Sequence, residues 1–329
     1  MQAIVQRAYG DPRNVLELQD LERPEPRDHE VRVRVRASSV NPADWMALVG
    51  HPYVLRLGFG VRRPKHRVPG KDVAGTVEAV GSKVTRWSVG AHVFGELPHG
   101  AYAQNALASE DALGPKPANL GFAEAAAAPL AGIAALQGIR DAGGVRAGHR
   151  VLVNGASGGV GTFAVQIAKA LGAHVTGVCS TSSVELVRSI GADEVIDYTR
   201  EDFTRGEARY DVIFDLVGSH APTAYRRVLR RDGVCVVATG MPGGKLLGPL
   251  PYLLRAALSS LRGRPKVRPF AARPNADDLT ALGKLIETGD VRPVIEHIYE
   301  LPEVAAALAR QGKGHARGKT VVAIDSPRP

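Results

Sequence analysis

Cysteine, aromatic residues and long apolar runs are scarce in this chain. Its 329 residues include two cysteines, Cys179 and Cys235, and both fall in expected strands. We expect both to be small core residues, because two thiols cannot build a cysteine-rich structural zinc lobe. No apolar run is long enough to cross a bilayer, and the first residues lack the pattern of a secretory signal. We therefore expect a cytoplasmic protein with no membrane partner.

Acidic residues are also outnumbered, but this does not indicate a nucleic-acid partner. The chain has 42 Lys and Arg against 33 Asp and Glu, a formal net charge of +9. A nucleic-acid site usually shows a basic helix or a basic patch with aromatic residues, and aromatics are only 5% here. The arginines are spread along the chain, as in Arg32, Arg34 and Arg36 on one face of an expected strand. We interpret them as solvated surface, in a protein whose charge also suits an anionic cofactor.

Glycine, by contrast, is concentrated in one turn. A short apolar run over residues 151–153 precedes glycines at 155, 158, 159 and 161, and apolar residues then recur at helical spacing until Gly172. Strand, glycine turn and helix in this order predict a phosphate cradle, because bare main chain can approach a pyrophosphate and the helix offers unpaired N–H groups. The alternative is a glycine-rich turn in an unrelated α/β domain.

Strand and helix patterns alternate around this turn and predict a doubly wound parallel sheet, an α/β fold. Further strand candidates are residues 174–179, 194–197, 210–217 and 233–238, and a helix is expected over 276–287. Short strands broken by Gly and Pro precede residue 120 and are typical of a small β barrel. We expect a catalytic domain over 1–120, a nucleotide-binding domain over 121–265, and a return to the catalytic domain over 266–329.

Four motifs carry a family resemblance. They are Ser39-Val-Asn-Pro-Ala-Asp44, Pro69-Gly-Lys-Asp-Val-Ala-Gly75, Asn154-Gly-Ala-Ser-Gly-Gly-Val-Gly161 and Gly318-Lys-Thr-Val-Val322. Together they resemble the medium-chain dehydrogenase/reductase superfamily, and within it the zinc-independent quinone oxidoreductase (zeta-crystallin-like) branch. The resemblance implies a β-rich GroES-like catalytic domain around a central Rossmann domain. It also implies hydride transfer from a nicotinamide in the cleft between them, and usually a homodimer.

The motifs depart from those of zinc-dependent members in a consistent way. Those members have a cysteine in the loop of residues 39–44, Gly-His-Glu in place of Gly70-Lys71-Asp72, and another cysteine near residues 129 and 130. None of these three ligands is present here. A catalytic zinc needs three protein ligands, so we expect no zinc and no other metal.

The end of the second Rossmann strand has no acidic residue that could hold the ribose hydroxyls of NAD. Residues 180–183 are Ser-Thr-Ser-Ser, and the first acid is Glu185. Small hydroxyls can donate hydrogen bonds to the extra phosphate of NADP, so we favour NADPH over NADH as the cofactor. The same serines could instead serve only to cap the following helix.

The resemblance also implies where the rest of the cofactor binds. Residues of the glycine turn would meet the pyrophosphate, hydroxyl and basic side chains the adenosine phosphate, and residues after later strands the ribose and the nicotinamide. The expected cofactor-binding residues are Ser157, Gly158, Gly159, Val160, Gly161, Ser180, Thr181, Tyr198, Val217, Thr239, Gly240, Phe270 and Lys319.

Without a metal to activate a carbonyl, conjugate reduction of an enone or quinone fits best. Hydride addition leaves charge on the carbonyl oxygen, which needs a hydrogen-bond donor. Asn41 is our candidate donor, although an Asn before Pro42 also serves turns. Tyr53 could protonate the substrate or only line its pocket. Asp44, the third candidate, could orient a neighbour, cap a helix or pair with Lys71.

The expected substrate is a small enone, quinone or carbonyl compound. One alternative is a zinc-free alcohol dehydrogenase or carbonyl reductase. Another, of a different class, is an NADPH-binding scaffold or a cyclase that moves no net hydride. The sequence leaves these three readings open, because loops that shape a substrate pocket vary freely.

Overall fold

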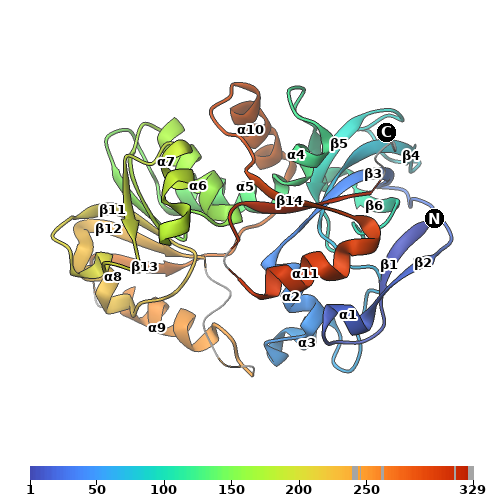
Figure 1. Ribbon diagram of the computed structural model, residues 1–329. Helices are drawn as coiled ribbons and strands as arrows, with labels where there is room; N and C mark the ends of the chain where they lie inside the picture. The colour runs from blue at the N-terminus through green and yellow to red at the C-terminus, as the bar shows by residue number, and fades with distance from the viewer. Residues whose placement is uncertain (239–243, 245, 261–262, 315, 325–329) are drawn as a thin grey trace. The chain divides into compact units, whose positions relative to one another are not determined.

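The computed structural model describes residues 1–238, 244, 246–260, 263–314 and 316–324, and the chain divides into two compact units (Figure 1). The first unit comprises residues 1–133, 274–288 and 293–329, and the second comprises 134–273 and 289–292. The sequence predicts the two main boundaries at 120/121 and 265/266, whereas the structure has them at 133/134 and 273/274. Gly132 explains the first shift, because a Cβ there would lie only 2.4 Å from Leu282 of the first unit. A strand beyond residue 265 that joins the second unit's sheet explains the other.

The second unit is built on a six-stranded sheet with the order β10-β9-β8-β11-β12-β13. Its strands are β8 (Arg150–Asn154), β9 (His174–Cys179), β10 (Glu194–Asp197), β11 (Tyr210–Asp215), β12 (Leu229–Val237) and β13 (Lys266–Pro269). Every neighbouring pair is parallel. The chain winds outward from β8 in one direction and from β11 in the other, which is the Rossmann order. The predicted doubly wound α/β sheet is confirmed.

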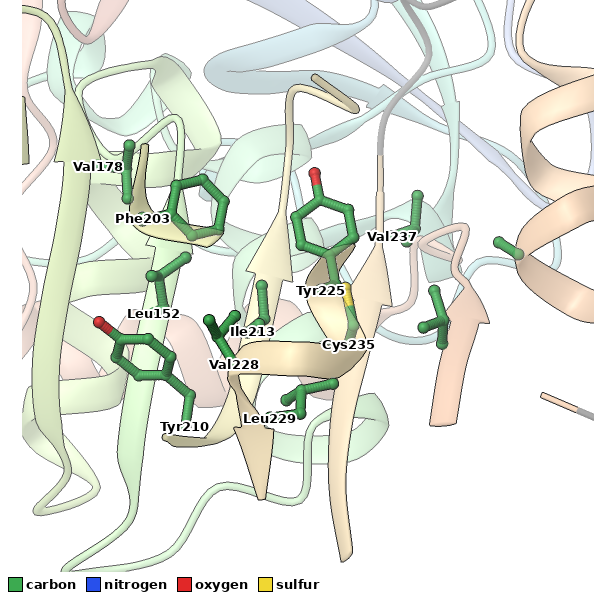
Figure 2. Packing of buried hydrophobic residues seen from close by; sticks show 12 residues of the cluster. Leu152, Val178, Phe203, Tyr210, Ile213, Tyr225, Val228, Leu229, Cys235 and Val237 are labelled. Atoms are coloured by element: carbon green, nitrogen blue, oxygen red, sulfur yellow. The ribbon is translucent and has the colours of Figure 1, made fainter. Parts of the chain in front are cut away.

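Helices of the second unit bury the apolar side chains of this sheet. They are α6 (Gly159–Ala170), α7 (Val184–Ser189), α8 (Pro222–Val228) and α9 (Leu250–Ser260), with a π-helix over Gln137–Ala142 after α5 (Pro129–Leu136). Figure 2 shows one buried layer, in which Leu152 and Ile213 of neighbouring strands lie with Tyr225 of α8. Cys179 and Cys235 are buried free thiols in strands, as predicted.

The first unit is organised around a second sheet, with the order β14-β15-β3-β4-β5-β7 and with β6 also paired to β3. Its strands are β3 (Glu30–Val40), β4 (Asp72–Val80), β5 (His92–Glu96), β6 (Asn105–Ser109), β7 (Leu113–Pro115), β14 (Ile295–Glu300) and β15 (Lys319–Ala323), beside the hairpin β1 (Gln2–Gln6) and β2 (Leu16–Asp20). In β3, Val31, Val33 and Val35 are fully buried, so the intervening arginines occupy the opposite face.

Helices from both ends of the sequence cover the first unit. They are α1 (Pro12–Val15), α2 (Pro42–Val49), α3 (Arg56–Phe59), α4 (Phe122–Ala126), α10 (Ala276–Glu287) and α11 (Val304–Gly312). Near the end of the chain, α11 packs beside α2 (Figure 1), and β15 pairs antiparallel with β3. The carboxyl-terminal segment therefore contributes directly to the sheet that carries the Asn41 loop. Within the part of the chain that the structure describes, no helix is long and apolar enough to cross a membrane.

Candidate functional site

The glycine turn after β8 has a main chain that only glycine permits at two positions. Gly155 has φ of 89°, in the left-handed region, and a Cβ on Gly161 would lie 2.1 Å from the carbonyl oxygen of Gly155. The N–H groups of Gly155 and Ala156 donate to the carbonyl of Val178 at 3.1 and 3.0 Å, which ties the turn to the end of β9. The sequence thus folds into a tight bend between β8 and α6.

This bend leaves a cradle for an anion. Ser157 to Val160 are partly exposed at the start of α6. The first N–H groups of a helix have no partner inside it, and the positive end of the helix dipole favours negative charge at the same place. A partly exposed helix start that follows a tight glycine bend therefore fits the pyrophosphate of a dinucleotide.

The structure brings most of the expected cofactor residues to one edge of the sheet. Ser157–Gly161 follow β8, Ser180 and Thr181 follow β9, Tyr198 follows β10, Val217 follows β11 and Phe270 follows β13. Because the strands are parallel, these residues share the carboxyl edge, where ligands of such sheets bind. Thr239 and Gly240 lie outside the described residues.

Lys319, the remaining expected cofactor residue, is part of the first unit. It begins β15 in the first unit and is 3% exposed. Its ammonium donates to Asn41 Oδ1 at 2.5 Å and lies 3.3 Å from Asp72 Oδ2. These two partners already engage the ammonium, and the predicted contact of Lys319 with the cofactor stays a prediction.

Asp215, which the sequence analysis missed, organises the loop after β11. Its carboxylate is fully buried and accepts hydrogen bonds from the N–H groups of Val217 and Gly218 at 3.2 and 3.0 Å. The hydroxyl of Tyr225 also donates to it, at 2.8 Å. Burial, and to a lesser extent the nearby charge of Asp215, raises the pKa of Tyr225. The Tyr225 hydroxyl therefore keeps its proton and remains a donor. The sequence signal for Asp215 was the position of an acidic residue at the end of an apolar strand.

The ends of β9 and β10 carry a second missed group. Thr181 Oγ1 donates to Asp197 Oδ2 at 2.5 Å, and Arg200 Nε lies 3.5 Å from the same oxygen. The hydrogen bond from Thr181 is the largest of several contacts that lower the pKa of Asp197, so the Asp197 side chain is an ionised carboxylate. Arg200 is thus a basic side chain beside the turn of residues 180–183, which itself contains no basic residue.

In the first unit, Asp72 at the start of β4 joins segments from across the chain. Its Oδ2 accepts from Ser39 Oγ at 2.5 Å and from Asn41 Nδ2 at 2.9 Å, and its Oδ1 accepts from the Leu130 N–H at 2.9 Å. Lys319 adds the fourth partner. The resemblance implies that three of these segments, the loop of residues 39–44, residues 70–72 and the region of residues 129 and 130, carry the zinc ligands in zinc-dependent members. We name Ser39, Asn41, Asp44, Asp72 and Lys319 the Asp72 cluster.

Asn41 is held by three members of the Asp72 cluster. It is 1% exposed, and its Nδ2 donates to Asp44 at 3.1 Å as well as to Asp72. Its Oδ1 accepts from Lys319. Both amide hydrogens are therefore in use, and Asn41 in this arrangement has none for a carbonyl oxygen of a substrate.

Asp44 closes the start of α2 by accepting from the Asn41 N–H at 2.9 Å. Burial, then the nearby charge of Asp72, raises the pKa of Asp44 to about 7. The Lys71 ammonium lies 3.4 Å from Glu96, and its charge also lowers the pKa of Asp44, which offsets part of the rise. A proton on Asp44 can therefore be exchanged near neutral pH.

Tyr53 lies apart from these buried groups. It begins the 3₁₀-helix Tyr53–Leu55 and is 44% exposed. The Arg56 guanidinium lies 4.7 Å from the centre of its ring, and the His51 ring lies 4.7 Å from it. An exposed phenol held by two neighbours can reach a ligand, which the buried amide of Asn41 cannot do without moving.

Comparisons with known proteins agree with this architecture. Family models for an alcohol dehydrogenase GroES-like domain and a zinc-binding dehydrogenase match residues 27–137 and 190–322. The chain is 32% identical to the chloroplast envelope quinone oxidoreductase homolog of Arabidopsis thaliana, over 98% of both chains. It belongs to the quinone oxidoreductase branch of the medium-chain dehydrogenase/reductase superfamily. As such it is an oxidoreductase.

Other members of the superfamily cover nearly as much of the chain. The NAD(P)H oxidoreductase RTN4IP1, mitochondrial, of Mus musculus is 34% identical, over 90% of this chain and 82% of that protein. A 2-methylene-furan-3-one reductase of Solanum lycopersicum is 31% identical, over 91% and 73%. The solved quinone oxidoreductase of Coxiella burnetii is 29% identical, with a TM-score of 0.87 over 99% of both chains.

The residues do not fit the zinc that the name of the second family model suggests. Among the described residues, no group of three or more His, Cys, Asp and Glu side chains could hold a metal ion. The acid at the corresponding place, Asp72, already accepts hydrogen bonds from Ser39, Asn41 and a main-chain N–H. We therefore derive no step of the reaction through a metal.

Proposed function

We propose that this oxidoreductase is a zinc-independent NADPH-dependent reductase that transfers hydride to the C=C bond of an enone or quinone. The observation that carries the proposal is the tight bend at Gly155 and Gly161, which leads into the partly exposed start of α6 at the carboxyl edge of the sheet. The names of its relatives support the proposal, since they include quinone oxidoreductases and a 2-methylene-furan-3-one reductase.

The second unit would hold the cofactor. The N–H groups at the start of α6 would bind the pyrophosphate, and Asp215 would keep the Val217–Gly218 loop in place along the ribose. Phe270, which follows β13, would pack at the nicotinamide end. A bound reduced nicotinamide supplies the hydride that adds to the electrophilic carbon.

We propose NADPH rather than NADH because of the groups at the ends of β9 and β10. Ser180 and the exposed Tyr198 offer hydroxyl donors, whereas the Thr181 hydroxyl already donates to Asp197, and Arg200 supplies a positive charge beside them. Asp197 is engaged by Thr181 and Arg200, so its charge is partly compensated. A ribose phosphate fits this set of donors better than two free hydroxyls do.

The substrate gains a hydride and a proton, and the enone oxygen carries charge between the two events. We propose that the Tyr53 hydroxyl is the donor to this oxygen, because it is exposed whereas the Asn41 amide is fully engaged. Asn41 and Asp44 then act as positioning residues that hold the loop before α2. The homodimer that the resemblance implies belongs to this proposal, and light scattering of the purified protein measures it.

A panel of enones and quinones mixed with NADPH tests the proposal. We expect loss of the absorbance of reduced nicotinamide with at least one of them, and product analysis that shows a saturated ketone or a quinol. Alcohol products from simple aldehydes or ketones alone would favour the carbonyl reductase alternative. Binding of NADPH without turnover of any acceptor would favour the scaffold alternative.

A further inference from the structure

Helix α9 of the second unit has apolar residues on two opposite faces. It lies beside α8 and β13 (Figure 1). One face packs on the core of its own unit, where Ala256 is fully buried and Tyr252 and Leu253 are partly buried. The Tyr252 hydroxyl also donates to the carbonyl oxygen of His220 at 3.1 Å, which fixes the face that the helix turns to the sheet. The other face is therefore turned away from the core of the second unit.

That outer face carries a row of leucines. Leu250, Leu254 and Leu258 recur every four residues and so form one line along the helix, which we name the leucine stripe. They are 46%, 60% and 52% exposed. Leu254 and the buried Ala256 are two positions apart, about 200° around the helix, so they lie on opposite faces. The stripe is thus a second apolar face, separate from the one that builds the core.

An exposed apolar row of this kind is unusual for a helix in water. A surface helix normally carries charged or polar side chains opposite its buried face. Single exposed leucines are common, whereas apolar residues that adjoin one another mark an interaction site. Leu246 and Leu247, just before the helix, are 66% and 47% exposed and add to the apolar residues at its start. The leucine stripe is therefore typical of a docking face.

The charge around α9 indicates which partner this face meets. Residues 233–276 contain no Asp or Glu. The basic residues of the same segment are Lys245, Arg255, Arg262, Arg264, Lys266, Arg268 and Arg273. Arg255 is exposed on α9 itself, and β13, which packs against α9, contributes Lys266 and the exposed Arg268. An apolar stripe within a basic segment that has no acid complements a surface with an apolar interior and anionic groups at its border.

We propose that the leucine stripe docks α9 on the surface of an anionic lipid membrane. The helix would lie in the plane of the interface, with its leucines among the acyl chains and Arg255 at the level of the lipid phosphates. A second copy of this chain is the less favoured occupant, because a twofold contact through this face would bring two basic segments without acids together.

The proposal differs from the sequence-based expectation of no membrane partner. That expectation rests on the lack of an apolar run long enough to cross a bilayer. A helix that lies on a membrane needs no such run, because it uses one apolar face and the attraction between its basic residues and anionic lipids. The exposure of the stripe, which the sequence alone does not show, is the observation that changes the interpretation.

Sedimentation of the full chain with lipid vesicles tests the proposal. One set of vesicles contains phosphatidylcholine and phosphatidylglycerol in equal amounts, and the other contains phosphatidylcholine alone. The double variant Leu254→Ser/Leu258→Ser interrupts the stripe. Its matched control, Leu18→Ser/Leu57→Ser, removes two exposed leucines of the first unit. Arg255→Ala measures the contribution of charge, and thermal melting checks that each variant is folded.

We expect the wild type to bind the mixed vesicles at least about tenfold more tightly than vesicles of phosphatidylcholine. The stripe variant should lose at least about tenfold in affinity, Arg255→Ala about fivefold, and the control less than about twofold. Failure of the wild type to bind the mixed vesicles would overturn the proposal, as would equal affinities of the stripe variant and the wild type, or equal losses in the two double variants. Equal binding to both kinds of vesicle would overturn the assignment to anionic lipid.

Sedimentation velocity without lipid examines the other occupant, a second copy of the chain. The wild type and the stripe variant should have the same mass in solution. If Leu254→Ser/Leu258→Ser dissociates an oligomer that the wild type forms, the stripe is a contact between copies and the membrane proposal is overturned. Failure of the reductase assay bears on none of these outcomes.

Discussion

The ammonium of Lys319 donates a hydrogen bond of 2.5 Å to Asn41 Oδ1, although 278 residues separate the two in the sequence. The same ammonium lies 3.3 Å from the buried carboxylate of Asp72. The last described strand of the first unit therefore fixes the loop that the family resemblance associates with catalysis. This contact makes the role of Lys319 testable apart from the cofactor.

Replacement of Lys319 by Ala should destabilise the fold and leave cofactor affinity nearly unchanged. Removing one partner of a buried ion pair typically costs about 3–5 kcal/mol, because the other charge stays buried without compensation. Denaturant unfolding measures this loss, and Lys313→Ala, on an exposed position of the same tail, is the control. A stable Lys319 variant with strongly weakened NADPH binding would instead support a direct role of Lys319 in cofactor binding.

Asp44 should make the stability of the fold depend on pH. Its folded-state pKa of about 7 lies above the ordinary value of 3.8 for an aspartate, so the folded state holds the proton more tightly than the unfolded chain. This contribution is fully present below about pH 4 and is lost as pH rises through about 7, at up to about 1.4 kcal/mol per pH unit. The Asp44→Asn variant, which resembles the protonated acid, should show a flatter profile of melting temperature against pH. The exposed Asp141→Asn is the control, and identical profiles for wild type and Asp44→Asn would refute the assignment.

Two substitutions in the glycine turn should have different effects. A Cβ on Gly161 meets the Gly155 carbonyl oxygen at 2.1 Å, whereas a Cβ on Gly158 lies 3.5 Å from the same atom. Gly161→Ala should therefore lower stability by about 1–3 kcal/mol, and Gly158→Ala should fold normally but bind NADPH more weakly. Melting curves and cofactor titrations measure the two effects. Gly206→Ala, with its Cβ 3.6 Å from the nearest atom, is the control for an unstrained position.

Arg200 should contribute to the choice between NADPH and NADH. If its guanidinium contacts the ribose phosphate, Arg200→Ala should weaken NADPH binding by about tenfold and leave NADH binding unchanged. Arg205→Ala, which removes an exposed arginine that pairs with Asp202, is the control. Equal losses for both cofactors would show that Arg200 acts through the loop and not through the phosphate.

The elements that the sequence could predict are those with strong local patterns. Residues 174–179 form β9 and residues 276–287 form α10 with the predicted bounds. A short segment rich in β-branched residues, with Val175, Thr176 and Val178, determines the first. Helical apolar spacing and a cap determine the second, since the Asn275 side chain accepts from the Asp278 N–H. The glycine turn is equally local, because its bend depends on residues within a few positions of one another.

The polar contacts could not be predicted in the same way. Asp72 and Lys319 are 247 residues apart, and only the register of β15, β3 and β4 brings them together. Asp215 and Tyr252 are likewise joined across 37 residues. Alternation along β3 predicted which face its arginines occupy. It could not predict that these arginines line a hollow together with Arg23 and the Val89–Gly90 turn, which come from elsewhere in the chain.

Hydride transfer itself tests the central proposal most directly. NADPH that carries deuterium on the reactive nicotinamide carbon should be mixed with the best enone of the panel, and the product examined by mass spectrometry and NMR. We predict one deuterium on the carbon β to the carbonyl, with the adjacent carbon protonated from solvent. Deuterium on the carbonyl carbon, or a product that contains no deuterium, would contradict the proposed conjugate reduction.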